Sequence, residues 1–191
     1  MTGIEIPSGV KSIGAHAFFG CRSLERIDLP ASLTAIGASA FANCKSLTQA
    51  VLPQGVSQIG YDTFYACSAL EQVTIPNSVT AIGSCAFYRC TALKSITIPG
   101  SVKTIESDAF LNCSNLESVT LISGVTTLGD FVFYGCKRIR TLTIPNTVTG
   151  MGQGVFTGWT NAQTVILSSG TNTANWNTAW KQDCSAKIET R

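Results

Sequence analysis

One pattern of hydrophobic and polar positions recurs seven times along this chain. It is clearest at 77–99, which reads NSVTAIGSCAFYRCTALKSITIP. Phenylalanine marks each copy at a constant spacing of 23 residues, at Phe18, Phe41, Phe64, Phe87, Phe110, Phe133 and Phe156. Because no insertion or deletion interrupts this column, we predict a repeat solenoid in which each copy packs against its neighbours.

The repeats divide the chain into two parts. Residues 1–7 match the end of a copy, seven full copies occupy 8–168, and the last block, 169–191, departs from the pattern. We therefore expect one repeat region over 1–168 and a different terminal element after it. Since the first residues resemble a repeat that has been cut, we also expect the chain to be part of a longer protein.

Each copy predicts two extended segments. The alternation of Ile96 and Ile98 with polar residues has the period of a short strand with one buried face, and stacked copies make such strands parallel, about 4.8 Å apart. Proline follows in most copies and ends the strand. The pair Val79 and Ile82 predicts a second short strand. The glycine that follows it, Gly83, predicts a positive φ or a close backbone approach.

A third segment predicts a helical turn. Ala17, Phe18, Cys21 and Leu24 are spaced as one face of a helix one or two turns long. The phenylalanines are the largest side chains of the unit, so we expect them to stack as the spine of the core.

Six of the eight cysteines occupy one column: Cys21, Cys44, Cys67, Cys90, Cys113 and Cys136. Neighbouring thiols would lie within disulfide distance, but side chains of one column point the same way. Trp159 takes the seventh place, which favours an apolar pocket over pairing. We therefore predict a ladder of reduced, buried thiols. Cys85 and Cys184 lie outside this column and are candidates for exposure.

Charge and composition exclude several classes of function. The net charge of +2 is too small to indicate nucleic-acid binding. The sequence shows no apolar run long enough to span a membrane and no signal peptide. It has one histidine, His16, around which any triad would have to form. We therefore predict that the protein is not an enzyme and binds no cofactor.

His16 stands in a variable column with Ser39, Asp62, Cys85, Asp108, Phe131 and Gly154. Asp62, Cys85 and Asp108 would be neighbours on adjacent copies, an arrangement that could form a metal site. Ser and Asp are also the usual residues just before a helix, and we favour this capping role. We accordingly predict no metal site.

The unit Ile-Pro-x-Ser-Val-Thr-x-Ile-Gly-x-x-Ala-Phe-x-x-Cys-x-x-Leu-x-x-Ile-x-Ile, present at 75–98, resembles the BspA-like, treponemal-type leucine-rich repeat. The resemblance covers residues 4–168. It implies a right-handed α/β superhelix with a parallel concave sheet and short helical turns on the convex side. It also implies a C-terminal cap at 169–191, with Trp176 and Trp180 on a short helical segment before a strand near 187–189.

The family resemblance further implies a bacterial cell-surface or secreted protein that serves in adhesion and binds host or extracellular-matrix proteins. We expect a monomer that does not insert into membranes. Two alternatives stay open: a structural spacer that presents a neighbouring domain, and a binder of a repetitive lattice such as ice or a polysaccharide that uses the regular threonine column.

The predicted ligand-binding surface consists of the outward strand positions that flank the buried isoleucines, since solenoids commonly bind on the concave sheet. These positions are Arg26, Asp28, Gln49, Gln72, Thr74, Ser95, Thr97, Ser118, Thr120, Thr141 and Thr143. Such residues are also simply suited to solvated strands. Two other features are weaker candidates: an aromatic column (Phe19, Tyr65, Tyr88, Tyr134) and a basic group (Lys137, Arg138, Arg140).

Overall fold

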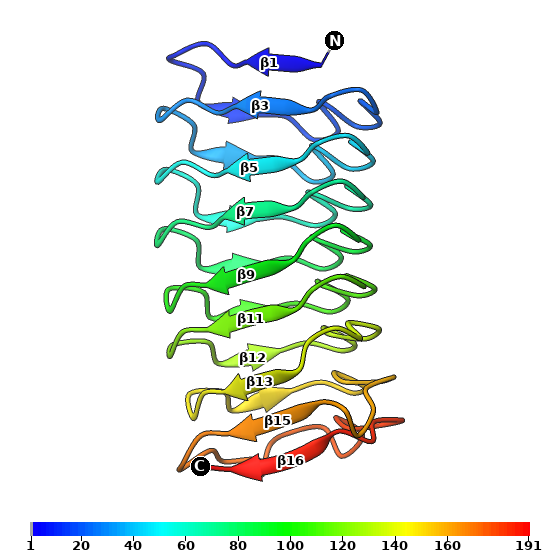
Figure 1. Cartoon of the computed structure of the whole chain (residues 1–191). Coiled ribbons are helices and arrows are strands. Elements are labelled where there is room, and N and C mark those ends of the chain that lie inside the picture. The colour runs from blue at the N-terminus through cyan, green and yellow to red at the C-terminus, as the bar shows by residue number, and fades with distance from the viewer. Residues whose placement is uncertain (1) are drawn as a thin grey trace.

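The computed structural model describes residues 2–191 and shows a column of stacked coils (Figure 1). Each coil has three sides: a longer strand, a two-residue strand and a turn segment. The longer strands form what we call the long-strand face, and they are β1 (Gly3–Glu5), β3 (Arg26–Asp28), β5 (Gln49–Val51), β7 (Gln72–Thr74), β9 (Ser95–Ile98), β11 (Ser118–Leu121), β13 (Thr141–Ile144), β15 (Thr164–Leu167) and β16 (Lys187–Thr190).

The two-residue strands form the opposite, short-strand face: β2 (Ser12–Ile13), β4 (Ala35–Ile36), β6 (Gln58–Ile59), β8 (Ala81–Ile82), β10 (Thr104–Ile105), β12 (Thr127–Leu128) and β14 (Gly150–Met151). Every strand pair is parallel, with partners 23 residues apart, as in Thr97 with Thr120. On the long-strand face, hydrogen-bonded ladders join β1–β3, β5–β7, β9–β11 and β13–β15–β16. Neighbouring ladders lie side by side, as β3 and β5 do. Both predicted strands are therefore confirmed.

The predicted helical turns are wrong, and the fold is an all-β solenoid rather than an α/β one. Residues 2–191 contain no helix. In the fourth coil, residues 84–89 form successive turns, in which the amides of Tyr88 and Cys90 bond three residues back. The amides of Cys85, Phe87 and Arg89 instead donate to the carbonyls of the next coil. Half of the amides thus join neighbouring coils, as in a sheet.

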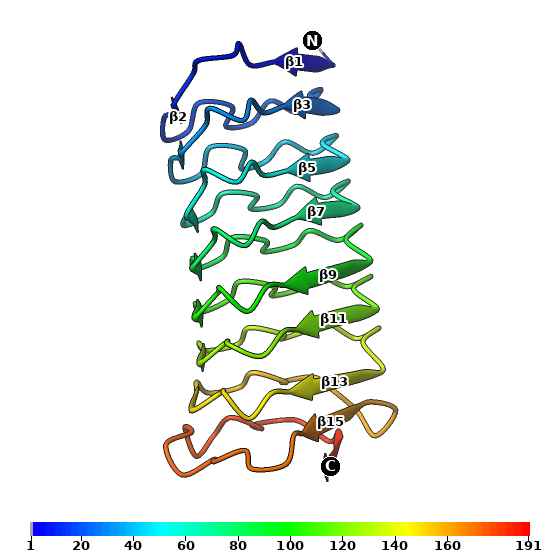
Figure 2. The same ribbon diagram turned by 90° about the vertical axis from the view of Figure 1, so that its left-hand side faces the viewer.

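Coil spacing explains why the helical pattern fails. Consecutive rings of the phenylalanine column stack with centroids 5.2–6.3 Å apart. A helix with its side chains is about 10 Å wide, so one helix per coil would not fit at this spacing. Since strands and turn segments have similar thickness, the column is nearly straight in both side views, and the long-strand face is flatter than the expected concave sheet (Figures 1 and 2).

Left-handed backbone recurs at two positions of every turn segment. The first is the column that begins with His16, and the second lies four residues later. The second column comprises Gly20, Asn43, Ala66, Arg89, Asn112, Gly135 and Gly158. The column of His16 therefore provides sharp turns and does not cap helices, which corrects the predicted role of Ser39, Asp62 and Asp108.

The glycines equivalent to Gly83 do not supply a positive φ, and most of them allow the close backbone approach that was the second predicted role. Gly83 has no positive φ, but a Cβ added there would lie 2.8 Å from the backbone of Gly60 and Tyr61. Gly37, Gly129 and Gly152 show the same close approach. Glu106, which replaces glycine in the fifth coil, accepts hydrogen bonds from the amide and hydroxyl of Ser84 in the coil before it. The close packing of consecutive coils thus explains four of the six glycines, whereas Gly14 and Gly60 have open space or ordinary contacts at this position.

We expect Ala66→Gly to stabilise the protein. Ala66 has a φ of +53°, a conformation that costs an alanine about 1–2 kcal/mol and a glycine almost nothing. The greater freedom of glycine in the unfolded chain offsets about 0.4–1 kcal/mol of this gain. Urea unfolding should show a net gain of about 0.5–1 kcal/mol. Ala92→Gly, at a position without positive φ, is the matched control and should destabilise.

The last block covers the end of the phenylalanine stack, although its turns are not the expected helix. The rings of Trp176 and Trp180 meet edge to face at 5.2 Å, and Trp180 lies against Phe156 at 5.9 Å. The indole nitrogen of the buried Trp176 donates to the carbonyl of Val148. Strand β16 then pairs with β15 in the register expected from Val165 and Ile188.

Candidate ligand-binding face

The structure places all eleven predicted binding residues at exposed positions on the long-strand face. They are Arg26, Asp28, Gln49, Gln72, Thr74, Ser95, Thr97, Ser118, Thr120, Thr141 and Thr143. The pleat of each strand produces this arrangement: in β9, Ile96 and Ile98 are buried, whereas Ser95 and Thr97 point outward. One continuous polar surface therefore runs along the column.

The middle of this surface carries no formal charge. Between Asp28 and Lys187, its two outward columns contain only amide, hydroxyl and apolar side chains. The hydroxyls are in register, since Ser95 pairs with Ser118 and Thr97 with Thr120. At the N-terminal end, Arg26 and Asp28 form an ion pair at 3.2 Å, which is exposed and contributes little stability.

Two shallow hollows follow the edge of the face where the strands end. The larger, of about 630 Å³, extends from Ile27 to Asn77 and includes Val51 and Thr74. The second, of about 430 Å³, is lined by residues from Gln72 to Ile122. Since Thr74, Ile75 and Asn77 line both, the two hollows adjoin, and we refer to them together as the groove.

Two exposed apolar side chains beside this groove were not among the binding residues predicted from the sequence. Val51 is 60% exposed and Ile122 is 45% exposed, and each lines one of the two hollows. The sequence carried a signal for both: Val51 interrupts a polar column, and Ile122 replaces the recurrent proline. Asn77, at the junction of the hollows, carried none. The groove thus offers both apolar and polar contacts along its length.

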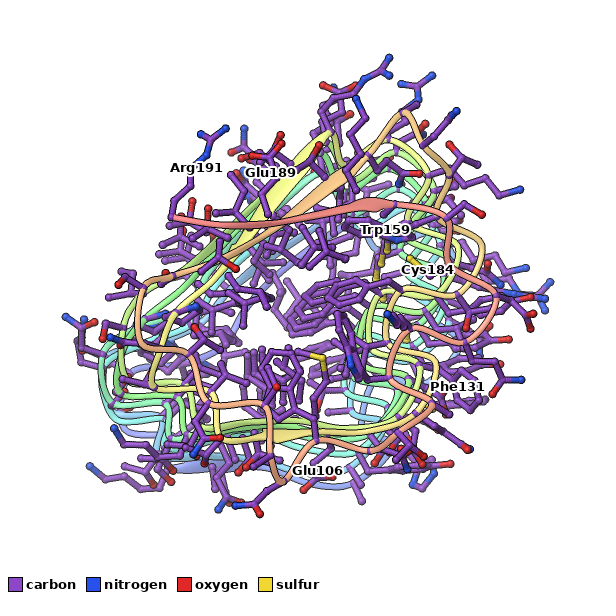
Figure 3. The ribbon with its side chains drawn as sticks, turned by 90° about the horizontal axis from the view of Figure 1, so that it is seen from below. Glu106, Phe131, Trp159, Cys184, Glu189 and Arg191 are labelled. Carbon is purple, nitrogen blue, oxygen red and sulfur yellow. The ribbon has the colours of Figure 1, made fainter. Side chains whose placement is uncertain are left out.

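The equivalent cysteines of successive coils form a hydrogen-bonded ladder inside the stack of coils. Five thiols, from Cys44 to Cys136, each donate to the carbonyl of a phenylalanine in the preceding coil, with Sγ–O distances of 3.0–3.1 Å. The indole N–H of Trp159, which lies inside the ring of coils, makes the equivalent bond to Phe133 at 3.0 Å (Figure 3). The column therefore selects a buried donor as well as an apolar group.

The structure also corrects the extent of this ladder. All eight cysteines are free, and five of the predicted six are buried. Cys21, in the first full coil, is exposed, and no phenylalanine-bearing turn segment precedes it among the described residues. Burial raises the pKa of the Cys44 thiol to about 11 and that of Cys113 to about 12, so these thiols are poor nucleophiles.

Asp62, Cys85 and Asp108, the neighbours that could in principle have formed a metal site, lack the arrangement for one. Within residues 2–191, no three metal-ligating side chains lie close enough to hold a metal ion. Desolvation raises the pKa of the Cys85 thiol to about 11, with smaller contributions from Asp108 and Asp62. Desolvation also raises the pKa of both carboxyls. A protonated thiol between two half-buried carboxyls lacks the properties of an activated nucleophile.

The aromatic column lies on the turn side of each coil. The rings of Tyr65 and Tyr88 stack at 4.8 Å and cover each other's faces. Phe19 and Tyr134 are exposed, and Phe131, on the same side, meets Tyr134 edge to face (Figure 3). Tyr65 and Tyr88 thus pack on each other, whereas Phe19 and Tyr134 contact the neighbouring column of His16 and Phe131.

Comparisons with known proteins agree with this architecture. The family model for the BspA-type leucine-rich repeat region matches residues 1–113 and 80–187, with six copies. A comparison with curated proteins finds no match.

Solved structures give a similar result. The leucine-rich repeat protein of T. pallidum is 36% identical, with a TM-score of 0.76 over 82% of this chain and 76% of its own. A Bacteroides ovatus leucine-rich repeat protein is 23% identical, with a TM-score of 0.49 over 98% of this chain and 66% of its own. The pneumococcal vaccine antigen PcpA is 18% identical, with a TM-score of 0.42 over 100% of this chain and 68% of its own.

Proposed function

Because this chain belongs to the BspA-type leucine-rich repeat family, we propose that it is a non-enzymatic module that binds a protein ligand on its long-strand face. Leucine-rich repeat proteins are commonly interaction or surface modules. The observation that carries the proposal is the uncharged face of in-register amide and hydroxyl groups, bordered by a groove with exposed Val51 and Ile122.

The physical basis of binding would be a prearranged surface. Each coil is fixed by ladder hydrogen bonds and by the ring stack beneath it, so little conformational entropy is lost when a ligand binds. Side chains such as Thr97 and Ser118 supply hydrogen bonds without the cost of desolvating a charge. Val51 and Ile122 offer apolar contacts that a protein ligand can bury.

We further propose a bacterial cell-surface or secreted setting, with a host or extracellular-matrix protein as the ligand and an adhesive role. This setting is the usual one for the family, and the proposal extends it to this chain. Within residues 2–191 the structure has no helix with the length and apolar character needed to cross a membrane.

We expect the double substitution Thr97→Arg and Thr120→Arg to weaken ligand binding at least about tenfold while the melting temperature changes by about 2 °C or less. Both side chains are exposed and adjacent, so two bulky cations would obstruct the face without disturbing the core. Binding to a panel of immobilised, purified matrix proteins measures the first effect, and thermal unfolding measures the second.

A matched control places the same change on the other side of the column. Gln58→Arg with Thr104→Arg adds two arginines to the short-strand face, in β6 and β10, and should leave binding unchanged. If the long-strand variant retained full affinity, the binding site would have to lie elsewhere. If none of the surface variants changed the binding affinity, the spacer function would be the better interpretation.

One alternative gains support from a specific observation. A curved sheet would disfavour a lattice binder, but the stack of coils is nearly straight (Figures 1 and 2). Thr74, Thr97, Thr120 and Thr143 occupy equivalent outward positions of β7, β9, β11 and β13. Their strands repeat at about 4.8 Å, a regular spacing that suits a repetitive ligand such as ice or a polysaccharide. Negative results in both a thermal-hysteresis assay and a glycan array would eliminate this function.

A further inference from the structure

A basic hollow lies at the other edge of the long-strand face, where the strands begin. It measures about 410 Å³ and is lined by Glu117, Arg138 and Arg140. Glu117 directly precedes β11, and Arg140 directly precedes β13. The hollow therefore opens beside Ser118 and Thr141, two residues of the proposed binding face, and lies across the strands from the groove.

The charges around this hollow do not balance. The Glu117 carboxylate accepts from Arg138 at 3.3 Å, and Lys94, one coil earlier, pairs with Glu71 at 3.0 Å. Arg140 has no carboxylate within 4.0 Å among the residues that the structure describes. The exposed Lys137 adds a further cation next to this group. One guanidinium at the edge of an otherwise uncharged face thus lacks a partner.

We propose that this basic hollow binds an acidic side chain of a polypeptide ligand that lies across the long-strand face. Arginine presents planar donors that match a carboxylate in a bidentate arrangement, and the single negative charge of Glu117 cannot neutralise two guanidinium groups. The neutral amides and hydroxyls next to the hollow suit the backbone of such a segment. This inference rests on the proposed function, which it refines by adding the charge of the ligand.

The test uses a fluorescently labelled deca-glutamate peptide and measures its affinity by fluorescence polarisation. We expect Arg140→Gln to weaken binding about fivefold, because a charge-assisted hydrogen bond is lost at a solvent-exposed site. Glu117→Gln should strengthen binding about threefold, because the competing carboxylate is removed. Lys45→Gln, which removes an exposed cation elsewhere in the chain, is the matched control and should change affinity less than about twofold.

Several results would overturn the inference. Equal losses in Arg140→Gln and Lys45→Gln would mean that the peptide responds only to overall charge. Absence of binding by the wild type, or a weaker affinity in Glu117→Gln, would also contradict it. If labelled heparin bound through Arg140 and the glutamate peptide did not, the hollow would serve a sulfated polysaccharide and the inference would be wrong.

The same variants separate this inference from the proposed function. Matrix-protein binding could be lost in the Thr97→Arg, Thr120→Arg variant but kept in Arg140→Gln. The long-strand face would then remain the binding site, and the hollow would have no part in binding. If the glutamate peptide bound through Arg140 while no face variant affected a protein ligand, the hollow would be a genuine acidic-peptide site and the proposed function would fail.

Discussion

Phe87→Ala is expected to lower the free energy of unfolding by about 3–5 kcal/mol. Phe87 is fully buried, and its ring stacks between those of Phe64 at 5.5 Å and Phe110 at 5.2 Å. Truncation removes the transfer free energy of the ring and leaves a cavity in the middle of the column. Because the rings on both sides are held by their own coils, the structure has little freedom to fill that cavity.

Urea unfolding followed by circular dichroism measures this loss. Phe19→Ala is the matched control, since Phe19 lies in the next position of its coil and is 54% exposed. It should change the free energy of unfolding by about 0.5 kcal/mol or less. A loss below about 1 kcal/mol for Phe87→Ala would show that the ring stack is not the main source of cohesion between coils.

We expect the four most deeply buried thiols to lower the stability by about 5 kcal/mol between pH 7 and pH 10. Burial raises the pKa of the Cys113 thiol to about 12 from an ordinary value of 9.0, and it raises those of Cys67, Cys90 and Cys136 as well. In the unfolded chain these thiols ionise near their ordinary value. Each then costs about 1.4 kcal/mol per pH unit above that value.

The direction of this effect follows from the raised pKa values. Below the unfolded pKa both states keep their protons, so stability is complete. As the pH rises from there toward the folded pKa, the unfolded chain releases protons that the folded chain retains, and stability falls. Urea unfolding from pH 7 to pH 10 under reducing conditions measures the slope.

A conservative variant identifies the thiols as the cause. Cys113→Ser keeps a donor for the Phe87 carbonyl but removes one titrating group, so the slope above pH 9 should decrease by about 1.4 kcal/mol per pH unit. A stability that is constant from pH 7 to pH 10 would contradict the buried, protonated ladder.

The sequence could predict the parts of the fold that depend on periodicity. A phenylalanine at every 23rd position required in-register stacking, and the alternation around Ile96 required a half-buried strand; both are present. The column of outward residues from Arg26 to Thr143 followed from the same alternation. Periodicity thus located the candidate surface without any knowledge of its ligand.

The helical turn could not be predicted correctly, because the spacing of Phe18, Cys21 and Leu24 fits two backbones. A helix and a series of turns both place these residues on one side. The difference lies in hydrogen bonds between coils, such as that from Phe87 to Ala109, which a pattern within one copy does not reveal. Coil thickness, a property of the whole stack, decides between them.

The finer features depended on single side chains. Cys and Trp can share one position because the indole of Trp159 donates to the same carbonyl position as the thiols, a contact that the sequence does not reveal. The basic residues Arg138 and Arg140 were visible in the sequence, but the hollow and the pairing of Arg138 with Glu117 depend on rotamers and on neighbouring coils.

Site-specific photo-crosslinking can show whether the ligand contacts the long-strand face. A benzophenone amino acid is placed at Thr97 in β9 or, as control, at Thr104 in β10 on the opposite side. Each variant is irradiated with the matrix protein that the wild type binds. We predict a crosslinked product from position 97 and none from position 104, whereas crosslinking from position 104 alone would show that the ligand binds the short-strand face instead.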